Sequence, residues 1–324
     1  MNYNTETCKS VCVQARELEL RGRLEDAKRA LGGLWRGLGI RPRMSVEKPI
    51  QGEVLLRIGS LSSKIGAKRG LSDVQERARD LLTEAVEIFR AYELKDKEAE
   101  ALHQLALTYY KDKSFDDALA LLEMAIPLYP AGDSRAIALM DRGVMESDSK
   151  RYESALEYYA QARPFIQTPL TEGLHLNGTA INQKRLGRFA EARMSYSGAA
   201  VCFELAGHLQ YQGAVENNIG GLLLQMGLTD EAREHLDRAE QIFRSINDER
   251  NLAEVRDTRW SKFSLEEELH RVEAKWIEKA LTESEGNKAE AARLLGISKQ
   301  SLHERLNRRF SELRAGESTV GRTS

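Results

Sequence analysis

The chain has 324 residues, of which 30% are charged and 6% aromatic, and its formal net charge is −2. This length allows two domains and a large buried core. The composition suits a soluble helical protein better than a β-sandwich, and only six prolines interrupt it.

The N-terminal segment has no apolar run of the kind found in signal peptides, and no stretch approaches the roughly 18 apolar residues of a membrane span. We therefore expect a cytoplasmic protein with no membrane partner. The three cysteines, Cys8, Cys12 and Cys202, should then be reduced thiols. Cys8 and Cys12 share a helix face, but no nearby Cys or His completes a metal site, so we expect them to be small buried hydrophobes.

Three segments in the middle of the chain repeat one pattern at a spacing of 37 residues. Each has an aromatic residue, an alanine three positions later and a second alanine seven positions after that. The three sets are Phe115/Ala118/Ala125, Tyr152/Ala155/Ala162 and Phe189/Ala192/Ala199. A fourth segment keeps Ala232 and Ala239 but has Thr229 in place of the aromatic residue. Because alanine lets two antiparallel helices approach closely, the pattern predicts stacked helical hairpins.

Another helical stretch precedes each alanine pair and has its own small residue: Ala106, Gly143, Ala180 or Gly220. The first of these stretches also has the order Leu-x-x-Leu-Ala-x-x-Tyr, formed by Leu102, Leu105, Ala106 and Tyr109. This resembles the tetratricopeptide repeat (TPR). The resemblance implies an all-α, TPR-like solenoid of about six helical hairpins over residues 1–247. The first two hairpins, around Ala27 and around Ala78 and Ala85, match weakly and could instead be generic helical hairpins.

In a TPR solenoid the first helices of the hairpins line a concave face. The resemblance gives candidate partner-binding residues on that face: His103, Tyr110, Asn177, Lys184 and Asn217. Asn177 and Asn217 occupy equivalent positions, and an amide can both donate to and accept from a peptide backbone. We therefore expect a peptide or protein segment in this groove. The alternative is that both asparagines are merely solvated polar residues.

The repeat stops after Asn247. Residues 248–263 are densely charged and have no alanine pair, which indicates a connector or a capping helix. A long helix should follow, because Ser264 and Glu267 have the spacing of a capping box. Its apolar residues form one stripe: Leu265, Leu269, Val272, Trp276 and Ala280. We assign residues 264–314 to a small C-terminal domain and 315–324 to a disordered tail.

Two shorter helical stretches follow the long helix, and Gly296 separates them. Asn287 is the predicted N-cap of the first stretch and Ser298 that of the second. The residues expected to face inward are Ala291, Ala292, Leu295, Leu302 and Leu306. A short helix, a glycine turn and a longer helix are typical of a helix-turn-helix. The first stretch has about two turns, too few for a TPR helix.

The order Gly286-Asn287-x-x-x-Ala291-Ala292-x-x-x-Gly296-Ile297, with Leu302 and Leu306 after it, resembles the Fis-type helix-turn-helix. That unit also ends many sigma-54-dependent activators. Residues 286–314 carry a net charge of +4 and the rest of the chain −6, a polarity that suits nucleic acid at this end. The resemblance implies double-stranded DNA as a partner and a homodimer joined through the preceding helix. Its candidate DNA-binding residues are Asn287, Lys288, Ser298, Lys299, Gln300, Ser301, His303, Arg305, Arg308 and Arg309.

The sequence departs from that family at His303 and Glu304, where basic residues are usual. Glu304 could accept a hydrogen bond from cytosine, could pair with Arg308 four residues on, or could weaken nonspecific DNA binding.

Motifs for catalysis are missing. The chain has no G-x-x-x-x-G-K-[ST] phosphate loop, no HExxH, no G-x-S-x-G and no paired-cysteine zinc motif. We therefore expect no enzyme activity, no cofactor, no metal and, without an ATPase module, no remodelling of polymerase. The sequence favours a DNA-binding transcriptional regulator whose TPR array binds a peptide or protein. The alternative is a TPR scaffold for protein assembly with no DNA role.

Overall fold

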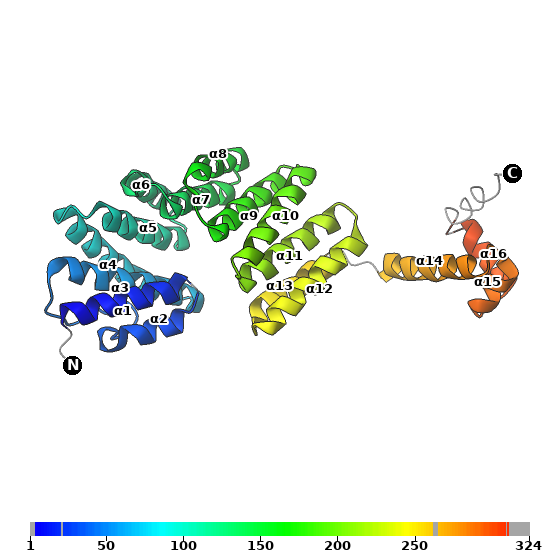
Figure 1. The fold of residues 1–324 in the computed structure, drawn as a ribbon, viewed down its shortest axis with the longest axis horizontal. Coiled ribbons are helices and arrows are strands. Elements are labelled where there is room, and N and C mark those ends of the chain that lie inside the picture. Colours follow the sequence, from blue (N-terminus) through cyan, green and yellow to red (C-terminus); the bar gives the residue numbers. More distant parts are fainter. Residues whose placement is uncertain (1–3, 21, 262–264, 309, 311–324) are drawn as a thin grey trace. The chain divides into compact units, whose positions relative to one another are not determined.

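The computed structural model describes residues 4–20, 22–261, 265–308 and 310. Within these ranges all regular elements are helices, so the predicted all-α class is confirmed (Figure 1). The chain divides into two compact units, Met1–Val255 and Arg256–Ser324. The tail expected at 315–324 lies outside the described residues. No described helix is long and apolar enough to cross a membrane.

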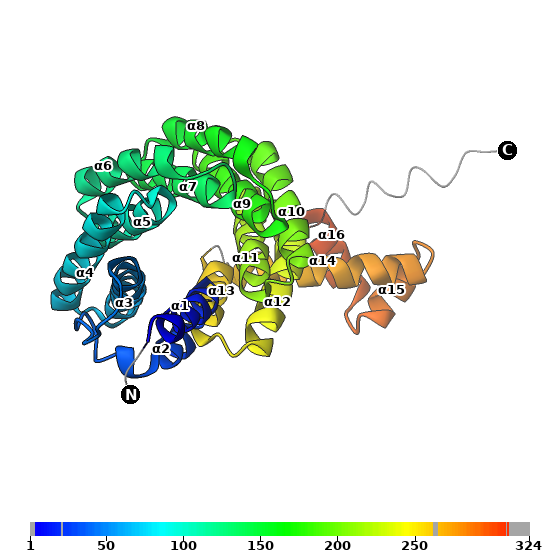
Figure 2. The same ribbon diagram turned by 60° about the vertical axis from the view of Figure 1, so that its left-hand side comes forward.

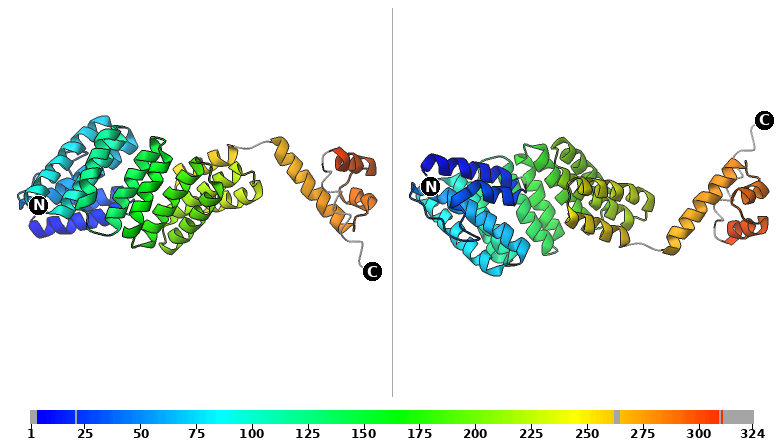
Figure 3. Two further views of the ribbon diagram at one scale, coloured as in Figure 1. Left: turned by 90° about the horizontal axis from the view of Figure 1, so that it is seen from above. Right: turned by 90° about the horizontal axis from the view of Figure 1, so that it is seen from below.

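Six helical hairpins follow one another in the first unit, as the TPR resemblance implies (Figure 3). Their helices are α1 (Thr5–Leu20) with α2 (Leu24–Leu31), α3 (Lys48–Arg69) with α4 (Ser72–Ala91), α5 (Lys95–Lys111) with α6 (Phe115–Ala125), α7 (Asp133–Asp148) with α8 (Tyr152–Ala162), α9 (Pro169–Arg185) with α10 (Phe189–Leu205), and α11 (Leu209–Gln225) with α12 (Thr229–Ser245). Short 3-10 turns follow three of these helices: η1 (Gly32–Leu34), η2 (Ile126–Leu128) and η3 (Arg163–Phe165).

The repeated small residues lie where the two helices of a hairpin touch. The paired alanines of α6, α8, α10 and α12 are all fully buried. A Cβ at Gly220 would stand 2.6 Å from Leu236 Cγ and 3.3 Å from the Ala232 carbonyl oxygen, so α11 and α12 need glycine there. Gly59 in the second hairpin stands in the same relation to Leu82 and Ala78, at 2.8 and 3.3 Å. The second hairpin, a weak match in sequence, therefore has the same close helix contact as the clear repeats.

The first helices of the hairpins lie on the inner side of the curved solenoid. Figure 2 shows α5, α7 and α9 inside the curve and α6, α8 and α10 outside it. In each hairpin, the side chains of the first helix that point away from the second helix therefore line the inner face.

Helix α13 (Glu249–Trp260) closes the last hairpin. Its Leu252 and Val255 are buried in one cluster with Leu236, Ala239 and Phe243 of α12. Such a helix covers the apolar face that a terminal repeat would otherwise expose to water.

The second unit has three helices, α14 (Leu265–Glu283), α15 (Lys288–Leu294) and α16 (Lys299–Arg308). Their shared core is formed by Ile277, Ala280, Ala291, Ala292, Leu302, Leu306 and Phe310. Ala280, the last residue of the predicted apolar stripe, is 4% exposed and belongs to this core, so the unit covers that end of the stripe itself. The predicted capping box at Ser264 and the side chain of Leu265 lie outside the described residues.

Candidate functional site

Helices α15 and α16 are fixed by the caps that the sequence predicts. The Asn287 Oδ1 atom accepts from the backbone N–H groups of Ala289 and Glu290, at 3.1 and 3.3 Å. The Ser298 Oγ atom accepts from the N–H of Ser301 at 3.0 Å. Gly296 between them has φ of 66°, a left-handed value that glycine adopts without strain. Gly296 and the Ser298 cap shape the turn between α15 and α16, and the Asn287 cap shapes the entry to α15.

One side of α16 is buried and the other is open. Leu302 and Leu306 pack inward as predicted. The open side carries Lys299, Gln300, His303, Glu304, Asn307 and Arg308. Asn307 was not among the expected residues, although its spacing of four from His303 and seven from Gln300 is a signal that it shares their face. This side presents two amides, an imidazole, two cations and the Glu304 carboxylate to solvent, and groups of these kinds bind base edges or phosphates.

Arg305 and Ser301 have a different environment from the one that the resemblance suggested. The Arg305 Nε donates to the carboxylate of Glu273 on α14, and Nη1 donates to the hydroxyl of Ser301. The two side chains are thus engaged within the unit and link α16 to α14. Their expected role as DNA contacts remains a prediction.

The other expected DNA-binding residues lie at the ends of the two short helices. Asn287 and Ser298 are exposed caps, and Lys288 is half-buried at the start of α15. Arg309 lies outside the described residues. Glu304 and Arg308 are both exposed, and the described contacts include no ion pair between them, so the suggested internal pair is not formed. Glu304 is thereby left on the open side of α16.

An apolar face of α14 points away from its own unit. Leu269, Val272 and Trp276 are 61%, 41% and 56% exposed, while Ile277 one residue further on is buried in the core. The Nζ of Lys279 lies 5.2 Å from the centre of the Trp276 ring. Large apolar side chains in a row on a short domain are typical of a surface that another chain covers.

On the inner face of the solenoid, an amide pair joins α9 to α11. The Asn218 Nδ2 donates to the Asn177 Oδ1 at 3.1 Å. Asn217 is only 7% exposed, and its Oδ1 is buried without a hydrogen-bond partner. The amide beside Asn177 therefore belongs to Asn218, which the sequence reasoning missed by one position. Because Asn217 and Asn218 are adjacent in the sequence, Asn218 was an alternative candidate for this position.

The remaining expected groove residues are partly engaged. His103 is buried, and its Nε2 lies 2.8 Å from the Asp141 carboxylate while its Nδ1 lies 3.3 Å from the Tyr129 hydroxyl. The Tyr110 hydroxyl donates to Asp148. Burial lowers the pKa of Lys184 below its ordinary value. These contacts place acids and aromatic rings along α5 and α7.

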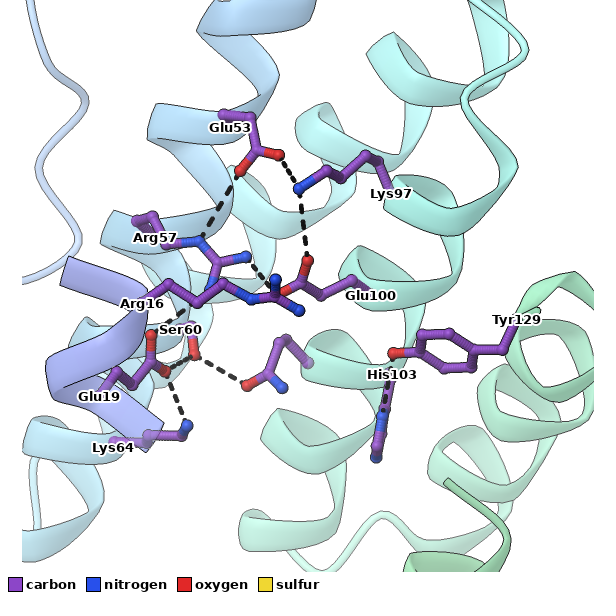
Figure 4. Close-up of polar contacts among 11 residues, drawn as sticks. Arg16, Glu19, Glu53, Arg57, Ser60, Lys64, Lys97, Glu100, His103 and Tyr129 are labelled. Carbon is purple, nitrogen blue, oxygen red and sulfur yellow. Dashed lines mark hydrogen bonds and ion pairs between the residues drawn. The ribbon is translucent and has the colours of Figure 1, made fainter. Parts of the chain in front are cut away.

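A charged network spans the inner sides of α1, α3 and α5 (Figure 4). At its centre, the Arg57 guanidinium is 3% exposed and pairs with the carboxylates of Glu19, Glu53 and Glu100. Burial alone would lower the pKa of Arg57, but these carboxylates raise it above its ordinary value. Burial would likewise raise the pKa of Glu100, but Arg57 and other cations hold it below its ordinary range. Arg57 and Glu100 therefore both favour their charged forms.

Three further cations surround this centre. Arg16 lies 3.1 Å from Glu100, Lys64 lies 2.7 Å from Glu19, and Lys97 pairs with Glu53. The Ser60 hydroxyl also donates to Glu19. None of these residues was expected from the sequence, because they meet only when helices of three different hairpins are stacked, and the first two of these hairpins match the repeat weakly.

Cys8 and Cys12 are buried in the core of the first hairpins, and burial raises the pKa of the Cys12 thiol to about 12. Across the residues that the structure describes, no group of three or more His, Cys, Asp or Glu side chains could hold a metal ion.

Profiles of known families match a segment in each of the two units. The profile of the bacterial regulatory proteins of the Fis family matches residues 268–308, which hold most of α14 and all of α15 and α16. The profile of the tetratricopeptide repeat matches residues 75–131. The chain thus contains TPR repeats and a C-terminal Fis-type helix-turn-helix, and both resemblances are confirmed. No curated protein matches the chain.

Several solved structures share a similar fold with this chain at low sequence identity. The apo form of the quorum sensor NprR from B. thuringiensis has a TM-score of 0.58 at 15% identity, covering 95% of this chain and 84% of that one. A Rap protein complexed with Competence and Sporulation Factor has a TM-score of 0.56 at 16% identity, covering 96% and 98%. Aspartyl phosphate phosphatase F from Bacillus subtilis has a TM-score of 0.56 at 14% identity, covering 86% and 74%. At these identities the likeness shows a TPR-like helical fold alone.

Proposed function

We propose that this protein is a sequence-specific DNA-binding transcriptional regulator whose TPR solenoid binds a peptide or protein partner. It acts by binding rather than by catalysis, and it works in the cytoplasm. The observation that carries the proposal is the open side of α16, where Gln300, His303 and Asn307 stand beside the cations Lys299 and Arg308. The match of residues 268–308 to the Fis family supports the same role.

The side chains of α16 divide into two groups in this proposal. Gln300, His303 and Asn307 meet base edges in the major groove, and Lys299 and Arg308 meet the flanking phosphates. Asn287 and Lys288 approach the DNA backbone from the start of α15, and Ser298 approaches it from the turn before α16. Arg305 acts as a positioning residue because it attaches α16 to Glu273 of α14, and Ser301 supports it by accepting a hydrogen bond from the same guanidinium.

The protein binds DNA as a homodimer joined through α14. The exposed row of Leu269, Val272 and Trp276 supports this, since nothing in its own unit covers it. A two-fold pair would place two α16 helices about one DNA turn apart, or closer if the DNA bends, and would favour a pseudo-palindromic site.

The inner face of the solenoid is the site of the partner. Asn177 and Asn218 offer amides to an extended backbone, and Lys184, Tyr110 and His103 lie on the same series of first helices. One structurally similar protein, a Rap protein, is complexed with Competence and Sporulation Factor, and another is a quorum sensor. These descriptions apply to the similar proteins themselves, and they are consistent with a solenoid that binds a signalling partner.

Selection of random DNA duplexes by the purified full-length protein, followed by sequencing, tests the proposal. We expect enrichment of a pseudo-palindromic sequence. A scaffold with no DNA role, the alternative function, would enrich no sequence above the input.

A further inference from the structure

Glu304 lies on the side of α16 that is opposite the core of its unit. It is two residues from Leu302 and two residues from Leu306, both of which are buried. Two residues turn an α-helix by about 200°, so the side chain of Glu304 leaves the helix opposite both leucines. Glu304 is accordingly exposed, as are Gln300 and Asn307, about one turn before and after it. Its carboxylate is therefore central on the face that the proposed function assigns to DNA.

This carboxylate is not neutralised by its own chain in the described residues. Two other acids of the unit are engaged, because Glu273 pairs with Arg305 and Glu290 pairs with Arg293. Glu304, by contrast, has no ion pair or hydrogen bond to its side chain among the residues that the structure describes. Its oxygens are thus available to a ligand.

A free carboxylate on a DNA-facing helix is unfavourable unless the DNA offers it a donor. The duplex carries one negative charge per about 1.7 Å of its axis, which repels the carboxylate. Entry into the groove also removes water from the carboxylate, and this costs free energy unless a hydrogen-bond donor replaces the water. The arrangement of α16 therefore requires a base that donates.

Cytosine is the base that meets this requirement best. In the major groove the bases present only two kinds of donor, the N4 amino group of cytosine and the N6 amino group of adenine. Adenine has the acceptor N7 beside its amino group, and guanine and thymine present acceptors alone. A carboxylate is repelled by each of these acceptors, whereas the edge of cytosine presents its amino group.

We propose that Glu304 is a specificity-determining residue, which accepts a hydrogen bond from the N4 amino group of one cytosine in each half-site. This inference rests on the proposed function, since it needs α16 in the major groove. Basic residues are usual at this position in the resembled family, so the contact is particular to this chain. Glu304 then acts in two ways, because it attracts one base and weakens binding to every duplex that lacks that base.

Titrations of the selected duplex by fluorescence anisotropy test this inference with full-length protein. Each position of the half-site takes the four base pairs in turn, changed symmetrically in both half-sites. We expect one position at which the unaltered protein prefers cytosine by about ten-fold or more. Glu304→Ala should lose that preference, keep the preferences at other positions and bind a scrambled duplex more tightly. The control Glu283→Ala removes an acid of α14 that is 55% exposed and pairs with Lys279, and it should keep the cytosine preference.

A modified base tests the same contact without a change in the protein. N4-methylcytosine still pairs with guanine, but its methyl group replaces the N–H that faces the major groove. At the position that depends on Glu304, this base should weaken binding of the unaltered protein by about ten-fold. It should leave the affinity of Glu304→Ala unchanged, because residues in contact are not additive and this variant has no contact to lose.

Thermal melting checks that the variants fold, which the exposure of Glu304 favours. Tighter binding of every duplex by Glu304→Ala, with all base preferences kept, would mean that the carboxylate only repels DNA and would overturn the base contact. An unaltered affinity for the N4-methylcytosine duplex would overturn it as well. Both results leave the proposed function intact, whereas failure of the unaltered protein to select any sequence would overturn the proposed function itself.

Discussion

The guanidinium of Arg305 on α16 donates a hydrogen bond to the carboxylate of Glu273 on α14, a residue 32 positions earlier in the chain. The same guanidinium donates to Ser301 one turn before it on α16. The arginine thus links α16 to α14, and Gln300, His303 and Asn307 remain exposed on the other side of α16.

Breaking this tie should weaken DNA binding. Glu273→Gln removes the charge that holds Arg305, so we expect a several-fold loss of affinity for the selected duplex. Because the Glu273 and Arg305 side chains are both partly exposed, the free energy of unfolding should fall by only about 0.2–1 kcal/mol. Fluorescence anisotropy measures the affinity. Glu290→Gln is the matched control, because it removes an acid that pairs with Arg293 on the exposed side of α15. Tighter binding by Glu273→Gln than by this control would mean that Arg305 itself contacts DNA.

The two groups of exposed side chains on α16 should respond differently to substitution. Asn307→Ala or Gln300→Ala should cost about 1–3 kcal/mol on the selected site and should relax the choice of base at one position. Lys299→Ala should weaken all duplexes alike and reduce the salt slope by about two, because the dimer loses one phosphate contact in each copy. Binding to the selected site and to a scrambled duplex, measured for each variant, separates the two effects. A uniform loss with Asn307→Ala and Gln300→Ala would remove them from base reading.

The apolar face of α14 should hold two chains together. Leu269→Asp puts a charge on a side chain that is 61% exposed in its own unit, so the fold should survive while the dimer dissociates. Light scattering on the full-length protein at tens of micromolar, with and without the duplex, measures this. Leu205→Asp on α10, where the leucine is 73% exposed, is the matched control and should stay dimeric. A monomeric unaltered protein on DNA would rule out this dimer.

Lys111 should make the stability of the solenoid depend on pH. Burial, together with the neighbouring Lys64, lowers its pKa to about 8, against the opposing charges of Glu19 and Asp112. An unfolded lysine has a pKa near 10.5, so between these two values the unfolded chain holds more protons and stability rises with pH. From pH 8 to 9.5 the unaltered protein should gain about 1–2 kcal/mol relative to Lys111→Met in urea denaturation. Parallel pH profiles for the two proteins would contradict this.

The parts of the fold that the sequence predicts are those fixed by local signals. The buried alanines recur at regular intervals because every hairpin needs the same close contact, and Asn287, Gly296 and Ser298 shape their turns through backbone groups two or three residues away. Such contacts form between residues that are close in the chain, so residue type and spacing are sufficient to predict them.

The details that escaped prediction depend on tertiary packing. Whether Asn217 or Asn218 faces Asn177 depends on a rotation of one residue about the α11 axis, which a repeat spacing does not resolve. The engagement of Arg305 depends on Glu273 in another helix. The network of Arg57 brings together α1 and α3, from two hairpins whose repeat signal is weak, and α5 of the first clear repeat. Long charged side chains meet across such distances only once the helices are stacked.

The salt dependence of duplex binding tests the central claim, that this is a DNA-binding regulator, most directly. Two copies that each place Lys288, Lys299 and Arg308 on phosphates should release counterions so that the logarithm of the binding constant falls with the logarithm of salt at a slope of about −5. Anisotropy titrations of the selected duplex from 50 to 300 mM salt, on the order of the physiological range, give this slope. A slope near zero, or equal affinity for selected and scrambled duplexes at every salt concentration, would contradict the account.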